Sequence, residues 1–189
     1  MIRKDRKITN YATIVKISDI PYSFKTAKPE EAEEIFHLYK KRVCWMNTKG
    51  INQWNVTGYL ERYPLTYYQE QCNMGYMYTL RTAENVLLGA VVLYPNDNRW
   101  FDKPKAPAYY IHNLVTDTNI KGIGKIILSK IEKLAIRHKK HFLRLDCASD
   151  NEFLNRYYEQ QGFILSGTCE DGKYKGNCRE KKLLHNKNI

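Results

Sequence analysis

The apolar positions of the chain follow the two periods that distinguish helices from strands. Apolar residues recur at helical spacing over residues 29–50 and again from Ile123 to about His138. Because an α-helix turns once every 3.6 residues, this spacing gathers the apolar side chains on one face. Pro29 is tolerated in a first helical turn, and Gly50 marks the end of the first stretch. A shorter helix is predicted within residues 66–74.

A fourth helix is predicted over about residues 151–161. Ser149 and Glu152 have the spacing of a capping box, in which two side chains satisfy backbone N–H groups at the start of a helix. Gly162 follows the segment, and glycine suits the position after the last helical turn. We therefore expect Ser149 and Glu152 to cap the start of this helix and Gly162 to cap its end.

Shorter segments have the length and pattern of strands. The second and third are separated by only residues 83–85, which predicts a tight hairpin. A polar, proline-containing excursion at residues 95–107 precedes the fourth, and the last two form a closing hairpin around Gly172 and Gly176. The segments expected as strands are residues 23–27, 76–82, 86–94, 109–116, 142–147, 163–168 and 177–184.

The order of these segments is β-α-α-β-β-β-α-β-α-β-β, which predicts one α/β domain with a mixed, mostly antiparallel central sheet and about four flanking helices. A chain of 189 residues is long enough for one such domain with a full core. We assign the domain to residues 23–184, with residues 1–22 as an N-terminal extension and residues 185–189 as a C-terminal tail.

The chain is basic, with a formal net charge of +11. A nucleic acid, an anionic cofactor or simple solubility would each account for that charge. The lysines and arginines are scattered rather than clustered, and no aromatic-basic strand motif of the kind that stacks bases is present. Nucleic-acid binding is therefore disfavoured against the other two explanations.

Cysteine spacing and hydropathy narrow the class further. The five cysteines include no C-x-x-C pair, which favours free thiols over a zinc site or a disulfide framework, although Cys169 and Cys178 could face each other across the closing hairpin. No apolar run approaches the ~20 residues that a membrane span needs, and no secretory signal is evident. A cytoplasmic location, no membrane contact and no metal are the resulting expectations.

Residues 111–125 pass from a strand through a short turn into a helix. Backbone N–H groups at a helix start have no intrahelical partners, and together with the helix dipole they form a site for anions. Gly122 and Gly124 remove side chains that would keep a diphosphate from those amides, while Lys121 and Lys125 add positive charge. The turn is therefore a candidate phosphate-binding element.

Together with this turn, residues 151–163 resemble the GNAT superfamily of acetyl-coenzyme A-dependent N-acetyltransferases. Members share an R/Q-x-x-G-x-G/A turn, followed after a helix and a strand by a pattern like N-x-x-A-x-x-F-Y-E-K-x-G-F. Two residues depart from the usual turn: Asn119 stands where the family usually has Gln or Arg, and Ile120 stands where it frequently has a further glycine. The residues at matching positions of the second pattern are Asn151, Leu154, Tyr157, Tyr158, Glu159, Gly162 and Phe163.

The resemblance implies transfer of an acetyl group from acetyl-coenzyme A to a primary amine by direct attack in a ternary complex. It implies that Tyr158 contacts and protonates the leaving sulfur, that Asn151 contacts the cofactor, and that backbone amides around Leu114, Val115 and Thr116 hold the pantetheine arm and polarise the carbonyl. The turn residues expected at the diphosphate are Asn119, Ile120, Lys121, Gly122, Ile123, Gly124 and Lys125.

Acetyl transfer also needs a group that removes the proton of the amine. His112 and Asp146 lie on adjacent predicted strands, and both are candidates for this group. The alternative for His112 is a purely structural role, and for Asp146 it is an ion pair with Arg144 or a cap at the strand end. Deprotonation of the amine through water is equally admissible. Gln53 and Trp54 are candidate substrate contacts, unless Trp54 only packs the helices on the sheet.

The acceptor is left open between a small molecule and a peptide, and a homodimer is not excluded. The alternative to an enzyme is a module of the same fold that binds acyl-coenzyme A without turnover, as a sensor or a partner-binding domain.

Overall fold

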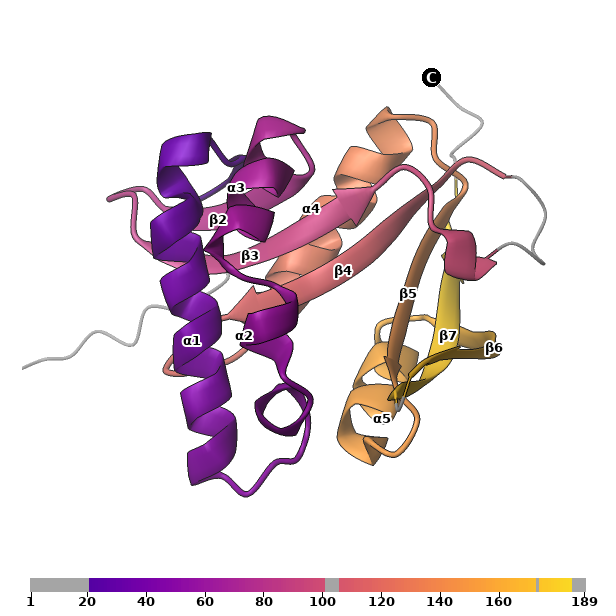
Figure 1. Cartoon of the computed structure of the whole chain (residues 1–189). Helices are drawn as coiled ribbons and strands as arrows, with labels where there is room; N and C mark the ends of the chain where they lie inside the picture. Colours follow the sequence, from indigo (N-terminus) through magenta and orange to yellow (C-terminus); the bar gives the residue numbers. More distant parts are fainter. Residues whose placement is uncertain (1–20, 101–105, 173, 185–189) are drawn as a thin grey trace, which may run out of the picture.

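The computed structural model describes residues 21–100, 106–172 and 174–184. They form a seven-stranded sheet in the order β1-β2-β3-β4-β5-β7-β6 (Figure 1). Only β4 and β5 pair in parallel, and every other neighbouring pair is antiparallel. The mostly antiparallel α/β sheet that the sequence predicts is confirmed. The strands are β1 (Tyr22–Thr26), β2 (Met77–Thr82), β3 (Leu87–Tyr94), β4 (Ala108–Thr116), β5 (Phe142–Ala148), β6 (Ile164–Asp171) and β7 (Tyr174–Lys182).

The four predicted helices are present as α1 (Ala32–Thr48), α3 (Leu65–Asn73), α4 (Ile123–Arg137) and α5 (Glu152–Gln160). The structure adds a four-residue helix that the sequence did not predict, α2 (Tyr59–Arg62), and three 3₁₀ turns, η2 (Pro29–Glu31), η3 (Trp54–Val56) and η4 (Asn98–Trp100). Elements this short span about one turn, so they contain no repeated apolar spacing from which to predict them.

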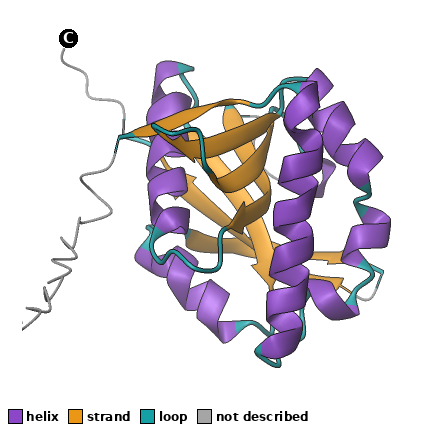
Figure 2. Cartoon of the chain, turned by 90° about the vertical axis from the view of Figure 1, so that its left-hand side faces the viewer, coloured by secondary structure: helices purple, strands orange, loops and turns teal. Residues whose placement is uncertain are grey.

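Helices cover both faces of the sheet (Figure 2). On one face α4 and α5 pack on a core that includes Ile111 and Leu145. On the other face α1 and α3 pack on a second core that includes Val92 and Val115. Strand residues alternate between these two cores because successive side chains of a strand point to opposite faces.

The sheet divides between β4 and β5. The parallel pairing begins at Ala108 and Phe142 and stops at Ile111 and Leu145. Beyond that point β5 stays paired with β7, whereas β4 stays with β3, so the two strands run apart (Figure 1). We call the region beyond Ile111 and Leu145 the strand divergence.

A β-bulge in β4 accompanies the strand divergence. Ala90 pairs with Val115 and Val92 with His112, so β4 has one more residue than β3 over this interval. Asn113, within the bulge, has a φ of 51°. Bulges bend a strand and increase its local twist, and this one lies where β4 leaves β5.

The start of α5 differs from the predicted capping box, which is wrong in its N-terminal residue. Asn151 is the N-cap, and its side chain accepts a hydrogen bond of 3.0 Å from the Leu154 N–H. Ser149 instead continues the pairing of β5 with β7, because its N–H donates to the carbonyl of Lys175 on β7 at 2.9 Å. Gly162 has a φ of 85° just after the helix, which confirms the predicted C-terminal cap.

The five cysteines are free thiols, four buried and Cys44 exposed. In the pairing of β6 with β7, Cys169 lies opposite Gly176 and Cys178 opposite Gly167, and the two thiols are nevertheless close enough to share a hydrogen bond. Within the described residues, no helix combines the length and the apolar character needed to cross a bilayer. Residues 1–20 and 185–189, most of the predicted extension and the predicted tail, lie outside the described residues.

Candidate active site

The turn before α4 has the geometry of an anion site. Gly122 is the N-cap with a φ of 86°, a left-handed conformation that favours glycine. Its carbonyl accepts from the N–H groups of Lys125 and Ile126, at 3.1 and 3.3 Å. No described residue accepts a hydrogen bond from the N–H of Ile123 or Gly124. Within the described part of the chain, these two backbone donors at the start of α4 therefore remain unpaired.

The predicted cofactor residues differ in how they can contribute. Asn119, Ile120, Lys121, Gly122 and Lys125 are exposed, whereas the side chains of Val115 and Ile123 are buried in the two cores, so these two can offer only backbone atoms. The Asn119 N–H is already bound to the side chain of Asp117 at 2.7 Å.

Helix α5 packs directly on the first turn of α4. A Cβ added to Gly124 would lie 2.8 Å from the hydroxyl oxygen of Tyr157. That hydroxyl is fully buried, and among the described residues it has no hydrogen-bond partner. The space that Gly124 leaves open is therefore occupied by a neighbouring phenol.

Tyr158, the residue expected at the leaving sulfur, is buried on the same face of the sheet. Its ring packs edge-on against Tyr157 and Phe163. Burial, with smaller contributions from Cys147 and Tyr157, raises the pKa of its hydroxyl well above the usual value. Tyr158 therefore keeps its proton, and no described residue forms a hydrogen bond with its hydroxyl.

His112 and Asp146 come together at the strand divergence. They directly follow Ile111 and Leu145, the last paired residues of β4 and β5. Because Ile111 and Leu145 point into the core under α4 and α5, alternation directs His112 and Asp146 to the opposite face, where α1 and α3 lie. The two candidate bases and Tyr158 therefore lie on opposite faces of the sheet.

An arginine that sequence reasoning missed joins the two candidate bases. Arg99, in η4, contacts Asp146 Oδ1 through Nη1 at 2.7 Å and the His112 Nδ1 through Nη2 at 2.8 Å. It also pairs with Asp97 through Nε and Nη2, at 3.2 and 3.0 Å. The predicted alternative of an Asp146–Arg144 pair is wrong, since Arg144 pairs with Glu180.

Asp97 completes this group, and its Oδ2 lies 2.9 Å from His112 Nε2. Burial opposes ionisation of Asp97, but hydrogen bonds from His112 and Arg99 outweigh it and hold the pKa of Asp97 well below its usual range. For Arg99 burial is likewise outweighed, by Asp146 and then Asp97, and its pKa is raised. Both groups are therefore charged at neutral pH. We call Asp97, Arg99, His112 and Asp146 the charged cluster.

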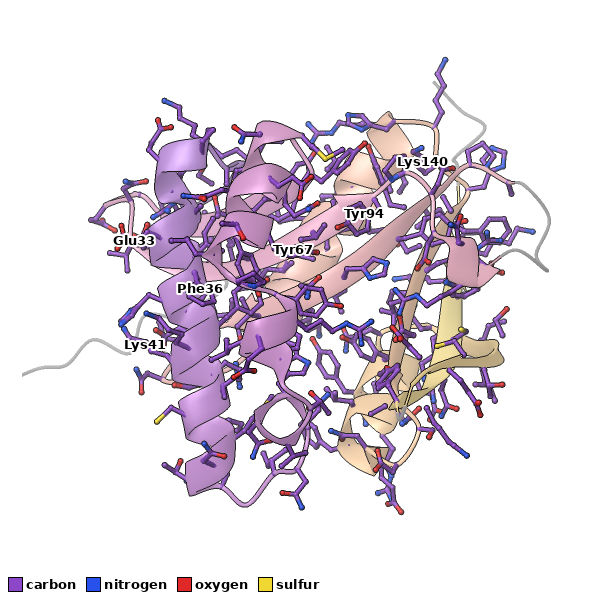
Figure 3. The ribbon with its side chains drawn as sticks, viewed as in Figure 1. Glu33, Phe36, Lys41, Tyr67, Tyr94 and Lys140 are labelled. Carbon is purple, nitrogen blue, oxygen red and sulfur yellow. The ribbon has the colours of Figure 1, made fainter. Side chains whose placement is uncertain are left out.

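Tyrosines from the helices hold the bulge of β4. Asn113 accepts from the Tyr67 hydroxyl at 3.0 Å through Oδ1 and donates to the Tyr59 hydroxyl through Nδ2. The hydroxyls of Tyr67 and Tyr94 lie 3.0 Å apart near the centre of the molecule (Figure 3). Trp54 stacks on Tyr59 with ring centroids 4.3 Å apart. Trp54 thus packs against Tyr59, one of the tyrosines that hold the bulge in place.

Gln53 and Asn151, predicted respectively as a substrate and a cofactor contact, lie next to each other. The amide of Asn151 donates to Gln53 Oε1 at 3.4 Å, which links the segment after α1 to the start of α5. A pocket of about 340 Å³ adjoins them, lined by Ile51, Asn52, Asp150, Asn151 and Glu152.

A second pocket of about 280 Å³ lies between α1 and the end of β4, with Trp45, Thr116 and Asn119 in its lining. Both pockets thus adjoin predicted site residues. In the described part of the chain, no three His, Cys, Asp or Glu side chains are arranged to hold a metal ion.

Sequence reasoning did not find Asp97 or Arg99 because they lie in a polar connection with no periodic pattern. Their role depends on contacts to two strands distant in sequence. The short spacing of an aspartate and an arginine is too common to have indicated the charged cluster.

Comparison with known proteins gives consistent results. Residues 44–163 match the family model described as acetyltransferase (GNAT) family. The chain is 25% identical over 150 residues to the uncharacterized N-acetyltransferase YesJ of Bacillus subtilis, an alignment that covers 76% of this chain and 82% of that protein.

Solved structures show the same fold. A GNAT-family acetyltransferase from Listeria monocytogenes superposes with a TM-score of 0.75 at 25% identity, over 89% of this chain and 99% of that one. The PaiA N-acetyltransferase of Thermoplasma acidophilum, solved in complex with coenzyme A, has a TM-score of 0.66 at 18% identity, over 86% and 99% of the two chains.

Proposed function

The chain belongs to the GNAT acetyltransferase family and is an acyltransferase, and from this premise we propose that it moves an acetyl group from acetyl-coenzyme A to a primary amine by direct attack in a ternary complex. Acetyl transfer from acetyl-coenzyme A is general to the family. The observation that carries the proposal is the strand divergence, with unpaired amides and Tyr158 on one face of the sheet and the charged cluster on the other.

The start of α4 fits the diphosphate of the cofactor. The unpaired N–H groups of Ile123 and Gly124 point out of the helix start, and Lys121 and Lys125 are exposed beside them. Such a helix terminus favours phosphate oxygens. The same fold holds coenzyme A in the Thermoplasma acidophilum protein, which supports the assignment.

The end of β4 supplies donors for the pantetheine arm and the thioester carbonyl. The N–H of Asp117 donates to Leu88 on β3 at 2.8 Å. Because successive N–H groups of a strand point to opposite edges, that of Thr116 faces the side from which β5 has diverged. A donor at this position stabilises the negative charge that develops on the carbonyl oxygen.

Tyr158 is the proposed donor to the departing sulfur. The raised pKa keeps its hydroxyl protonated, so it is able to donate a hydrogen bond as negative charge develops on sulfur. Full proton transfer is uphill, because a thiol is normally a stronger acid than a phenol. Hydrogen bonding rather than complete transfer is therefore the role that the site supports best.

His112 and Asp146 both stay candidates for accepting the amine proton, directly or through water, and both ring nitrogens of His112 are already engaged, Nδ1 by Arg99 at 2.8 Å and Nε2 by Asp97 at 2.9 Å. Asp146 already accepts from Tyr174 at 2.7 Å and from Arg99, so both of its oxygens are engaged. Imidazole suits proton exchange near neutral pH. Asp146 then helps to hold Arg99 in place.

Release of coenzyme A with a panel of primary amines tests the proposal. We expect coenzyme A to form only when acetyl-coenzyme A and an amine are both present, with an equal amount of acetylated amine found by mass spectrometry. Mass detection avoids the background of the exposed Cys44 thiol. Tight binding of acetyl-coenzyme A with no amine-dependent release would contradict the proposal and favour a non-catalytic binding module.

A further inference from the structure

The charged cluster indicates which amines the site accepts. We propose that the acceptor is an aliphatic primary amine with no carboxylate next to the reacting nitrogen, and that free α-amino acids are excluded. This inference rests on the proposed function, because it concerns the acceptor of that reaction.

The charged cluster lies where an acceptor must approach. Tyr158 and the unpaired amides of α4 lie on the face covered by α4 and α5. In the proposed reaction, the acceptor reaches the thioester from the other face through the strand divergence, which begins at His112 and Asp146. The amine therefore passes these side chains, and any charged group beside its nitrogen meets them too.

A carboxylate on the acceptor would find no free partner in Arg99. All three guanidinium nitrogens of Arg99 are engaged, Nε and Nη2 by Asp97 and Nη1 by Asp146. Two carboxylates against one guanidinium leave the charged cluster with one negative charge when His112 is neutral. An ammonium group is attracted by that charge and a carboxylate is repelled.

Other described arginines near this region do not reverse that balance, and Arg144, which lies over the Trp100 ring, is paired with Glu180. Arg62, which interacts electrostatically with Arg99, is paired with Asp171 of β6. Arg42 lies farther along β4, where its Nη2 donates to the carbonyl and the hydroxyl of Thr116, both at 2.7 Å, and its guanidinium stacks over Trp45. The carboxylate that interacts electrostatically with Arg42 is Asp117.

Matched acceptors isolate the effect of the carboxylate. We would measure kcat/KM for leucine, for leucinamide and for isoamylamine, and for the corresponding valine and phenylalanine series. The amide has the shape of the amino acid without its charge. Its amine is more acidic than that of the amino acid, whereas the amine of the decarboxylated compound is less acidic, so the two comparisons bracket any effect of amine basicity.

We expect both neutral analogues to exceed the amino acid by roughly tenfold or more, since like charges at a binding site are strongly disfavoured. Asp97→Asn removes one carboxylate and should reduce that preference, whereas Glu170→Gln, the same change of charge at an exposed surface pair with Lys175, should leave it unchanged. The wild-type ratios test the inference even if Asp97→Asn does not fold.

Equal or better turnover of the amino acids than of both analogues would overturn the inference and leave the proposed function intact. Absence of acetylation with every amine would instead overturn the proposed function, and the inference with it.

Discussion

Tyr158 combines a retained proton with a hydroxyl that no described residue uses. We expect Tyr158→Phe to lower kcat on the order of 100-fold, the effect of removing one donor from a developing negative charge. The dissociation constant of acetyl-coenzyme A should change little, because the phenyl ring keeps its packing against Phe163. Steady-state kinetics and calorimetry on the same preparation measure the two quantities. Unchanged turnover would remove Tyr158 from the mechanism.

Gly124 and Tyr157 form a coupled pair of residues. A methyl group at position 124 would lie 2.8 Å from the Tyr157 hydroxyl oxygen but 3.7 Å from the ring carbon that carries it. We expect Gly124→Ala to destabilise the wild type by about 1–3 kcal/mol through overpacking, and to cost clearly less in a Tyr157→Phe background. Urea unfolding of the wild type, the two single variants and the double variant gives the coupling energy.

Tyr157→Phe alone serves as the control for that cycle. It removes a buried hydroxyl without a partner, so the free energy of unfolding should stay equal or rise by about 1 kcal/mol. The same cost of Gly124→Ala in both backgrounds would show that the hydroxyl is not what excludes a side chain at position 124.

At the scale of the elements, α5 begins at a cap that also touches the predicted substrate segment. Asn151→Ala removes the side-chain acceptor of the Leu154 N–H and should lower the free energy of unfolding by about 1 kcal/mol. Asn151→Asp keeps the acceptor and should retain most of the stability. Both variants lose the amide donor to Gln53, so a loss of cofactor affinity common to the two would report on that donor. Equal stability of the Ala and Asp variants would contradict the capping role.

The elements predicted well from the sequence are those long enough to repeat their pattern. The amphipathic stripe of α4 and the strands on either side of it were found within one or two residues. Helix α2 was not found, because four residues cannot show a period and its position depends on contacts such as that of Tyr59 with Asn113. The cap of α5 was misplaced because local spacing alone did not reveal that Ser149 continues the pairing with β7.

At the scale of the whole molecule, the candidate site divides into a part encoded locally and a part encoded by topology. The turn before α4 and Tyr158 belong to continuous motifs and were predicted as such. Of the charged cluster, His112 and Asp146 were predicted as candidate bases but Asp97 and Arg99 were not, because Arg99 acts through strands that it meets only in the folded chain. The register of β5 on β7 explains the wrong partner of Asp146: Arg144 lies opposite Glu180, whereas Asp146 lies opposite Cys178 and is left to pair with Arg99.

The separation of Tyr158 from His112 and Asp146 by the sheet also affects the sequence of events during turnover. If acetyl-coenzyme A and the amine reach the site from opposite faces of the sheet, neither blocks the entry of the other, so neither has to bind first. We therefore expect a random rather than a compulsory order of addition, which initial-rate kinetics with both substrates varied would test. Free coenzyme A should then compete with acetyl-coenzyme A and leave binding of the amine unaffected, and an amine that has to bind second would contradict this.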